Sequence, residues 1–113
     1  INTIPAMAID IETRRPKIAN ITGGLSGPAV KPVAVKMVYE TARAVDIPII
    51  GMGGIFSGED AVEFLLAGAS AIAVGTAIFA DPLAPVKVLN GISAYLERHG
   101  CKSVTEIIGQ VRV

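Results

Sequence analysis

The sequence predicts an α/β fold in which parallel strands are joined by helices, and three observations support this prediction. Hydrophobic residues make up 51% of the 113 residues and aromatic residues 4%, with no Trp. The interior must therefore be built from Val, Ile, Leu and Ala, which are typical of buried parallel strands. Short apolar runs that end at glycine alternate with stretches of helical spacing, and such alternation requires helical crossovers. The length corresponds to one domain.

The first residues predict a strand end followed by a hairpin-like excursion. The chain opens on Ile1 without an initiator Met, and residues 1–5 have the pattern of the last step of a strand that runs into a loop. We therefore expect that further residues precede them. Over residues 6–22, apolar and polar positions alternate in two short stretches around a charged middle, which is typical of a hairpin-like segment.

A helix and a strand are expected next. Pro28 suits the first turn of a helix, because its missing N–H would be unpaired there. The apolar spacing that follows predicts a helix over about residues 29–44. Residues 48–52 form a short apolar run that glycine cuts off, which predicts a buried strand.

A second helix and strand repeat this order. Ser57 and Asp60 have the spacing of a capping box, and Gly68 is placed to end the helix that they begin. Residues 70–75, with the sequence SAIAVG, predict the next buried strand.

The last third of the chain predicts two helices. Asp81 and Pro82 open the longer one, and Gly100 ends it. Its apolar residues recur every three or four positions, at Leu83, Val86, Leu89, Ile92 and Leu96. Ser103 and Glu106 form another candidate capping box, for a short final helix through about Ile108.

Two small glycine clusters lie where the two predicted strands end. Gly53 and Gly54 follow the first strand, and Gly75 with the small hydroxyl of Thr76 follows the second. Backbone N–H groups at the carboxyl ends of parallel strands can bind a phosphate where no side chain intervenes. One glycine pair alone indicates a tight turn, but two pairs in phase favour a phosphate site. A branched side chain at Gly54 is expected to enter that site.

The spacing of the clusters predicts a particular architecture. In an eight-stranded α/β barrel, phosphate binds after the seventh and eighth strands, beside a short extra helix, and residues 76–81 have the length of that helix. We therefore expect the C-terminal portion of a (β/α)8 TIM barrel, from the end of strand 6 through helix 8. Residues 1–113 would then be part of one domain, incomplete as a single chain, because about three strands would leave both sheet edges open.

Other residues at the predicted rim offer less chemistry. Asn2 and Thr3 lie where strand 6 would end and could bind a planar ligand with amide and carboxylate groups, although an ordinary turn explains them equally well. The loop of residues 23–27 suits either an anion or simple flexibility. No paired carboxylates, metal-ligand set or Ser/His/Asp arrangement occurs, so that no metal is predicted and the catalytic base stays unknown.

Charge and hydropathy exclude some classes of partner. Ten basic and ten acidic residues give a formal net charge of zero, so that no overall field attracts nucleic acid or an anionic membrane. No apolar run has the length of a membrane span and no signal-peptide pattern opens the chain. We expect a cytoplasmic protein.

Taken together, these motifs resemble the C-terminal part of the dihydroorotate dehydrogenase family, the flavin barrel enzymes of pyrimidine biosynthesis. The resemblance runs from residues 1–32 through residues 47–79 to the final helices. The stretch GGLSGPAVKP is similar to the class 1B type, whose catalytic subunit works with an iron–sulfur electron-transfer subunit.

This resemblance implies an FMN-dependent oxidation of (S)-dihydroorotate to orotate, with the catalytic base in the N-terminal part of the barrel, outside this chain. It implies substrate binding by Asn2 and Thr3. It implies FMN binding by Ile1, Gly27, Gly53, Gly54, Gly75 and Thr76. The implied partners are the N-terminal half of the same barrel, an iron–sulfur and FAD electron-transfer subunit and a second copy of the chain.

Two alternatives stay open on the residues alone. The first is another phosphate-binding barrel, such as a dihydropyrimidine dehydrogenase-like enzyme or a sugar-phosphate isomerase. The second is a non-enzymatic half barrel that assembles with itself or with a partner. Ligand identity separates the first from the flavin enzyme, and flavin affinity combined with solution mass separates the second.

Overall fold

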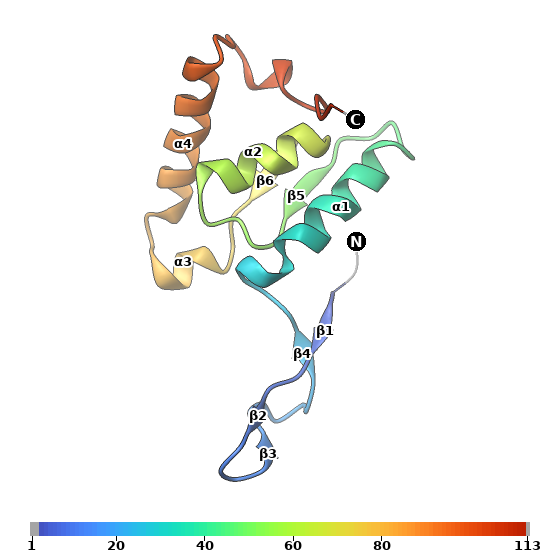
Figure 1. Cartoon of the computed structure of the whole chain (residues 1–113), viewed down its shortest axis with the longest axis vertical. Coiled ribbons are helices and arrows are strands. Elements are labelled where there is room, and N and C mark those ends of the chain that lie inside the picture. The colour runs from blue at the N-terminus through green and yellow to red at the C-terminus, as the bar shows by residue number, and fades with distance from the viewer. Residues whose placement is uncertain (1–2, 113) are drawn as a thin grey trace.

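The computed structural model describes residues 3–112 and divides into an antiparallel ribbon and an α/β body (Figure 1). The ribbon occupies residues 5–24 and projects away from the body. The body contains a two-stranded parallel sheet with helices packed against it. The α/β class predicted from the sequence is therefore confirmed.

The ribbon consists of two short antiparallel pairs. Strand β1 (Pro5–Ala6) pairs with β4 (Gly23–Gly24), and β2 (Ile9–Asp10) pairs with β3 (Arg15–Pro16). The turn at the tip is fixed by Asp10, whose carboxylate accepts the backbone N–H groups of the residues two and three positions later. These hydrogen bonds lower the pKa of Asp10. The ribbon's large apolar side chains are exposed: Met7, Ile9, Ile11, Ile18 and Ile21.

The first helix follows the ribbon directly. A 3-10 turn, η1 (Pro28–Val30), leads into α1 (Lys31–Ala42). The helix therefore ends two residues before the predicted position, with Arg43 as its C-cap. It packs on the sheet through Val38, which is buried. Val33, on the predicted apolar stripe, is exposed.

The parallel sheet is formed by β5 (Ile50–Met52) and β6 (Ala71–Ala73). Both strands are shorter than predicted, and the prediction that they are buried is only half correct. On one side, Gly51 is buried against the ring of Phe64 from the next helix. On the other side, the side chains of Ile50 and Met52 are each 59% exposed. The reason is that α1 and α2 cover one face of this sheet (Figure 1), and nothing within residues 3–112 covers the other.

Helix α2 (Gly58–Ala67) lies between the two strands in the chain. The capping box is confirmed: the Ser57 hydroxyl accepts the Asp60 N–H, and the Asp60 carboxylate accepts the Ser57 N–H. Gly68 ends the helix in the left-handed conformation, with φ 119°, which glycine adopts without steric cost. The buried Phe64 joins α2 to the main core, together with Val38 and Val88.

A short helix, α3 (Ala77–Ala80), follows β6 as predicted, and α4 (Ala84–Arg98) packs against α2. Helix α4 begins at Ala84, after a turn in which the Asp81 carboxylate accepts the N–H of Leu83. Three apolar residues of its repeat are exposed: Leu83, Val86 and Leu89. The predicted final helix is a 3-10 turn, η2 (Val104–Glu106), with its capping box present.

Candidate functional site

A cavity of about 260 Å³ lies at the carboxyl ends of β5 and β6. Its lining comes from three loops: the one before η1, the one after β5 and the one after β6. The predicted cofactor residues in the described chain all line it, namely Gly27, Gly53, Gly54, Gly75 and Thr76. The structure therefore brings together three segments that are far apart in the sequence.

Thr3, the predicted substrate residue, lines a second and larger cavity of about 480 Å³. This cavity adjoins the first, because both are lined by Leu25, Val30, Met52 and Gly53. Ile1 and Asn2, predicted to bind FMN and substrate respectively, lie outside the described residues.

The first glycine turn is tightly packed by the protein itself. Gly53 and Gly54 have φ values of 116° and 75°, which L-residues with side chains rarely adopt. A Cβ atom on Gly54 would lie 2.7 Å from the carbonyl oxygen of Gly27 and 3.0 Å from the backbone nitrogen of Lys31. The expectation that a side chain at Gly54 enters the phosphate space is therefore wrong, because its first atom is directed against the start of α1.

The second glycine turn is open. A Cβ atom on Gly75 would have no neighbour within 4 Å, and Gly75 is not among the residues with positive φ. The carbonyl groups of Gly75 and Thr76 accept the N–H groups of Ile78 and Phe79 in α3, at 3.0 and 3.2 Å. Thr76, the N-cap of α3, makes no side-chain capping hydrogen bond.

Backbone N–H groups with no protein acceptor accompany these turns. Within residues 3–112, the amides of Gly54, Gly75 and Thr76 donate no hydrogen bond to the protein. Amide N–H groups collected from neighbouring turns form anion-binding concavities, and a phosphate offers several acceptor oxygens to such a set. The cavity therefore has the donors and the small residues that a phosphate group requires.

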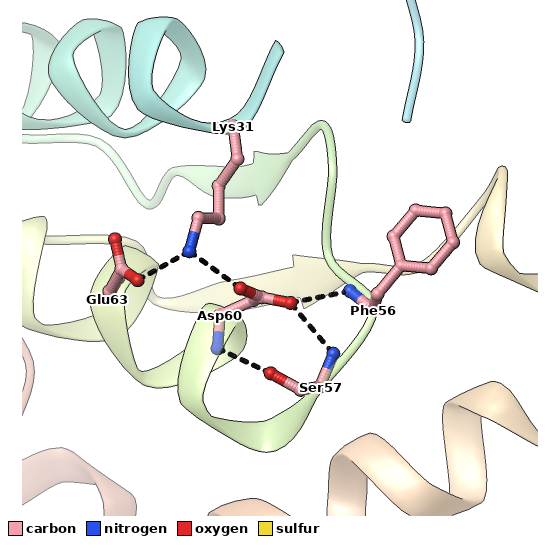
Figure 2. Close-up of polar contacts among 5 residues, drawn as sticks. All are labelled: Lys31, Phe56, Ser57, Asp60 and Glu63. Atoms are coloured by element: carbon pink, nitrogen blue, oxygen red, sulfur yellow. Dashed lines mark hydrogen bonds and ion pairs between the residues drawn. The ribbon is translucent and has the colours of Figure 1, made fainter. Parts of the chain in front are cut away.

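A polar cluster fixes the first turn from behind (Figure 2). One carboxylate oxygen of Asp60 accepts the N–H groups of Phe56 and Ser57, each at 2.9 Å. The other accepts Lys31 Nζ at 2.6 Å, and the same Nζ lies 2.6 Å from Glu63. Partial burial acts to raise the pKa of Asp60, but the Lys31 ammonium and the two amides outweigh it, so that the pKa lies below its usual value.

The sequence interpretation identified Asp60 as a capping residue and did not identify its partner. Lys31 and Asp60 are separated by 29 positions, so that no local spacing connects them. Three basic residues of the ribbon are exposed, namely Arg14, Arg15 and Lys17.

The family model for dihydroorotate dehydrogenase matches residues 1–96. The chain belongs to the dihydroorotate dehydrogenase family. It is 61% identical over 113 residues to dihydroorotate dehydrogenase B (NAD(+)), catalytic subunit, of Bacteroides fragilis, covering 100% of this chain and 37% of that relative. It is 60% identical over 111 residues to the protein of the same name from Alkaliphilus metalliredigens, covering 98% of this chain and 37% of the relative. These relatives confirm the class 1B resemblance.

Solved structures agree with this assignment. The crystal structure of dihydroorotate dehydrogenase from Eimeria tenella in complex with ferulenol matches with a TM-score of 0.75 and 31% identity, covering 93% of this chain and 29% of that one. The ligand-free form from the same organism matches with the same TM-score and identity. The chain thus spans 37% of the length of the curated relatives above.

Among residues 3–112, no group of three or more His, Cys, Asp or Glu side chains is arranged to hold a metal ion. In the same part of the chain, no helix has both the length and the apolar character that crossing a bilayer requires.

Proposed function

We propose that this chain carries the FMN phosphate site of an enzyme that oxidises (S)-dihydroorotate to orotate in de novo pyrimidine biosynthesis. The observation that carries the proposal is the cavity at the ends of β5 and β6, where Gly27, Gly54 and Gly75 come together from three loops. Family membership favours this flavin enzyme over a sugar-phosphate isomerase.

The proposed architecture is the C-terminal part of a TIM barrel, from the end of strand 6 through helix 8, with the N-terminal half supplying the remaining strands. The free edge of β5 supports it, because β5 pairs with β6 alone within the described residues. The larger cavity runs beside that edge and is lined by Thr3, α1 and β5. An apolar groove next to an unpaired edge suits a further parallel strand.

The residues present fit FMN at its phosphate end. The amides of Gly54, Gly75 and Thr76 would hold the phosphate oxygens, Gly53 would line the site beside them, and Gly75 would leave the space that the phosphate needs. Ile1 and Gly27 would line the cofactor, while Asn2 and Thr3 would orient the substrate. FMN, when bound, supplies the acceptor for the two electrons that leave the substrate. The catalytic base would come from the N-terminal half.

The remaining assignments follow the relatives. The words "catalytic subunit" in their names support a second subunit. We propose that this subunit carries iron–sulfur and FAD groups and passes electrons onward. We further propose a cytoplasmic homo-oligomer that binds dihydroorotate and orotate.

An anaerobic half-reaction tests the proposal in the full-length subunit. The purified protein is expected to carry FMN, identified by mass spectrometry, and to lose its visible flavin absorbance when dihydroorotate is added. Dihydrouracil is the matched control, because it lacks the carboxylate of dihydroorotate. A protein that binds no flavin after reconstitution with excess FMN, or one that is bleached by dihydrouracil and not by dihydroorotate, would contradict the assignment.

A further inference from the structure

Lys31, Asp60 and Glu63 form a polar cluster (Figure 2). None of the three lines the cavity, but Lys31 follows Val30 and Asp60 accepts the N–H of Phe56, and Val30 and Phe56 do line it. Lys31 is the first residue of α1, and Asp60 belongs to the first turn of α2. Their side chains are 23% and 18% exposed, whereas that of Glu63 is 49% exposed. The Lys31–Asp60 pair is therefore the shielded part of the cluster, where solvent screens an ion pair least.

This pair joins the two loops that precede α1 and α2. On the α1 side, Val30 donates its N–H to the Gly27 carbonyl at 3.2 Å, which ties the Gly27 loop to the start of the helix that Lys31 continues. On the α2 side, Asp60 accepts the N–H groups of Phe56 and Ser57. Gly27 and Phe56 line the cavity on opposite loops. A shift of either helix start would therefore change the shape of the cavity.

The pair also balances charge close to an anion site. The hydrogen bonds to Asp60 and Glu63 raise the pKa of Lys31, so that its ammonium stays charged at neutral pH. Asp60 stays ionised as well, because its pKa is lowered. Without the ammonium, the carboxylates of Asp60 and Glu63 would both remain unpaired. That of Glu63 is screened by solvent, whereas that of Asp60 is shielded and lies beside the loop whose amides are available to a phosphate. One such charge at a separation on the order of 10 Å weakens anion binding by about tenfold.

We propose that Lys31 and Asp60 are positioning residues for the flavin phosphate: their ion pair fixes the Gly27 and Gly54 loops relative to each other and neutralises the carboxylate that fastens the second loop. The inference rests on the function proposed above. It assigns to Lys31 the role of a charge partner that acts through Asp60, without contact with the cofactor.

The test compares FMN with riboflavin, which lacks the phosphate, in titrations of the full-length apoprotein followed by flavin fluorescence. Lys31→Met is expected to weaken FMN binding about tenfold and to leave riboflavin binding within about twofold. Adding Asp60→Asn to Lys31→Met removes the shielded carboxylate and leaves unpaired only that of Glu63, which is 49% exposed, so that most of the FMN affinity should return. Lys31→Arg should bind FMN nearly as the wild type does.

Lys36→Met is the matched control, because Lys36 lies on the same helix and pairs with Glu40 at the surface. It is expected to change neither affinity. Equal losses for FMN and riboflavin in Lys31→Met would overturn the inference, since they indicate a general structural defect. Unchanged FMN binding in that variant, or a double variant as weak as Lys31→Met, would also overturn it. If Lys31→Met gives no folded protein, Asp60→Asn decides by the same ratio. It removes the carboxylate and keeps the Lys31 ammonium, so that FMN affinity must rise relative to riboflavin affinity, and a fall in this ratio would overturn the inference. A wild-type protein that binds no FMN would instead refute the proposed function itself.

Discussion

The turns after β5 and β6 resemble each other in the sequence and differ in their contacts. At Gly54 the backbone has a positive φ, and its missing side chain leaves room for the Gly27 carbonyl and Lys31. At Gly75, no atom of residues 3–112 lies within 4 Å of the position that a Cβ atom would take. The helix after the first turn has a full capping box, and the helix after the second has no side-chain cap. Glycine is thus required by the fold in the first turn and is available to a ligand in the second.

The largest effect is expected from Gly54→Val in the full-length subunit. The substitution places a branched side chain at φ 75° with its Cβ atom 2.7 Å from a backbone oxygen. Strain and overpacking together should lower the free energy of unfolding by about 3 kcal/mol or more, measured by urea denaturation of the apoprotein. A loss below about 1 kcal/mol would show that the first turn can move aside, and the contrast between the turns would disappear.

Gly75→Val should have the opposite signature. A Cβ atom at this position meets no atom of residues 3–112 within 4 Å, so that the free energy of unfolding should stay within about 1 kcal/mol of the wild type. If the phosphate occupies this space, the valine side chain displaces it and breaks the hydrogen bonds that the backbone amides donate to this charged group. FMN affinity should then fall about 10- to 100-fold. Fluorescence titration measures this, with Gly75→Ala as the smaller matched substitution. Wild-type affinity in Gly75→Val would place the phosphate elsewhere.

The caps distinguish the turns on a smaller scale. Ser57→Ala removes the hydroxyl that accepts the Asp60 N–H at 3.1 Å, and loss of such a cap costs about 1 kcal/mol of stability. Thr76→Val keeps the shape of the side chain and removes no capping hydrogen bond. Its free energy of unfolding, measured by thermal denaturation, should therefore stay within about 0.5 kcal/mol of the wild type. Equal losses in the two variants would show that the second turn is also held by its side chain.

What the sequence could predict is mostly local. The capping box at Ser57 and Asp60, the stop at Gly68 and the short helix after Thr76 all depend on residues within a few positions, and each is present. The order of helices and strands follows from the same local patterns. Backbone conformation and capping are decided over three or four residues, which is why these predictions succeeded.

What the sequence could not predict depends on contacts between distant segments. Periodicity shows that Val86 and Leu89 belong to a helix, but it does not show whether another element covers them, and they are 54% and 61% exposed. Whether a Cβ atom on Gly54 has room depends on Gly27 and on the start of α1 at Lys31, which lie 27 and 23 positions earlier in the chain. The Lys31–Asp60 pair likewise exists because two helix starts meet in space.

The smallest expected effect is the dependence of the free energy of unfolding on pH. It tests whether the charge of a single group, the Asp60 carboxylate, holds the loop after the first glycine turn. Partial burial opposes ionisation of Asp60, yet Lys31 and the amides of Phe56 and Ser57 bring its pKa below the usual 3.8. The unfolded chain therefore binds more protons than the folded chain between the two pKa values. The stabilisation is complete above pH 3.8 and is lost as the pH falls through the folded pKa.

Asp60→Asn removes this contribution. The variant should be less stable than the wild type by about 1 kcal/mol or less at neutral pH, and this difference should shrink toward acid pH in urea titrations. The pKa of Asp81, which precedes α4, is lowered as well, by Lys87 and the Leu83 amide. The wild type and Asp60→Asn both keep Asp81, so that its contribution cancels in the difference between their free energies of unfolding. A deficit that stays constant with pH would mean that Asp60 holds the turn through shape alone, without its charge.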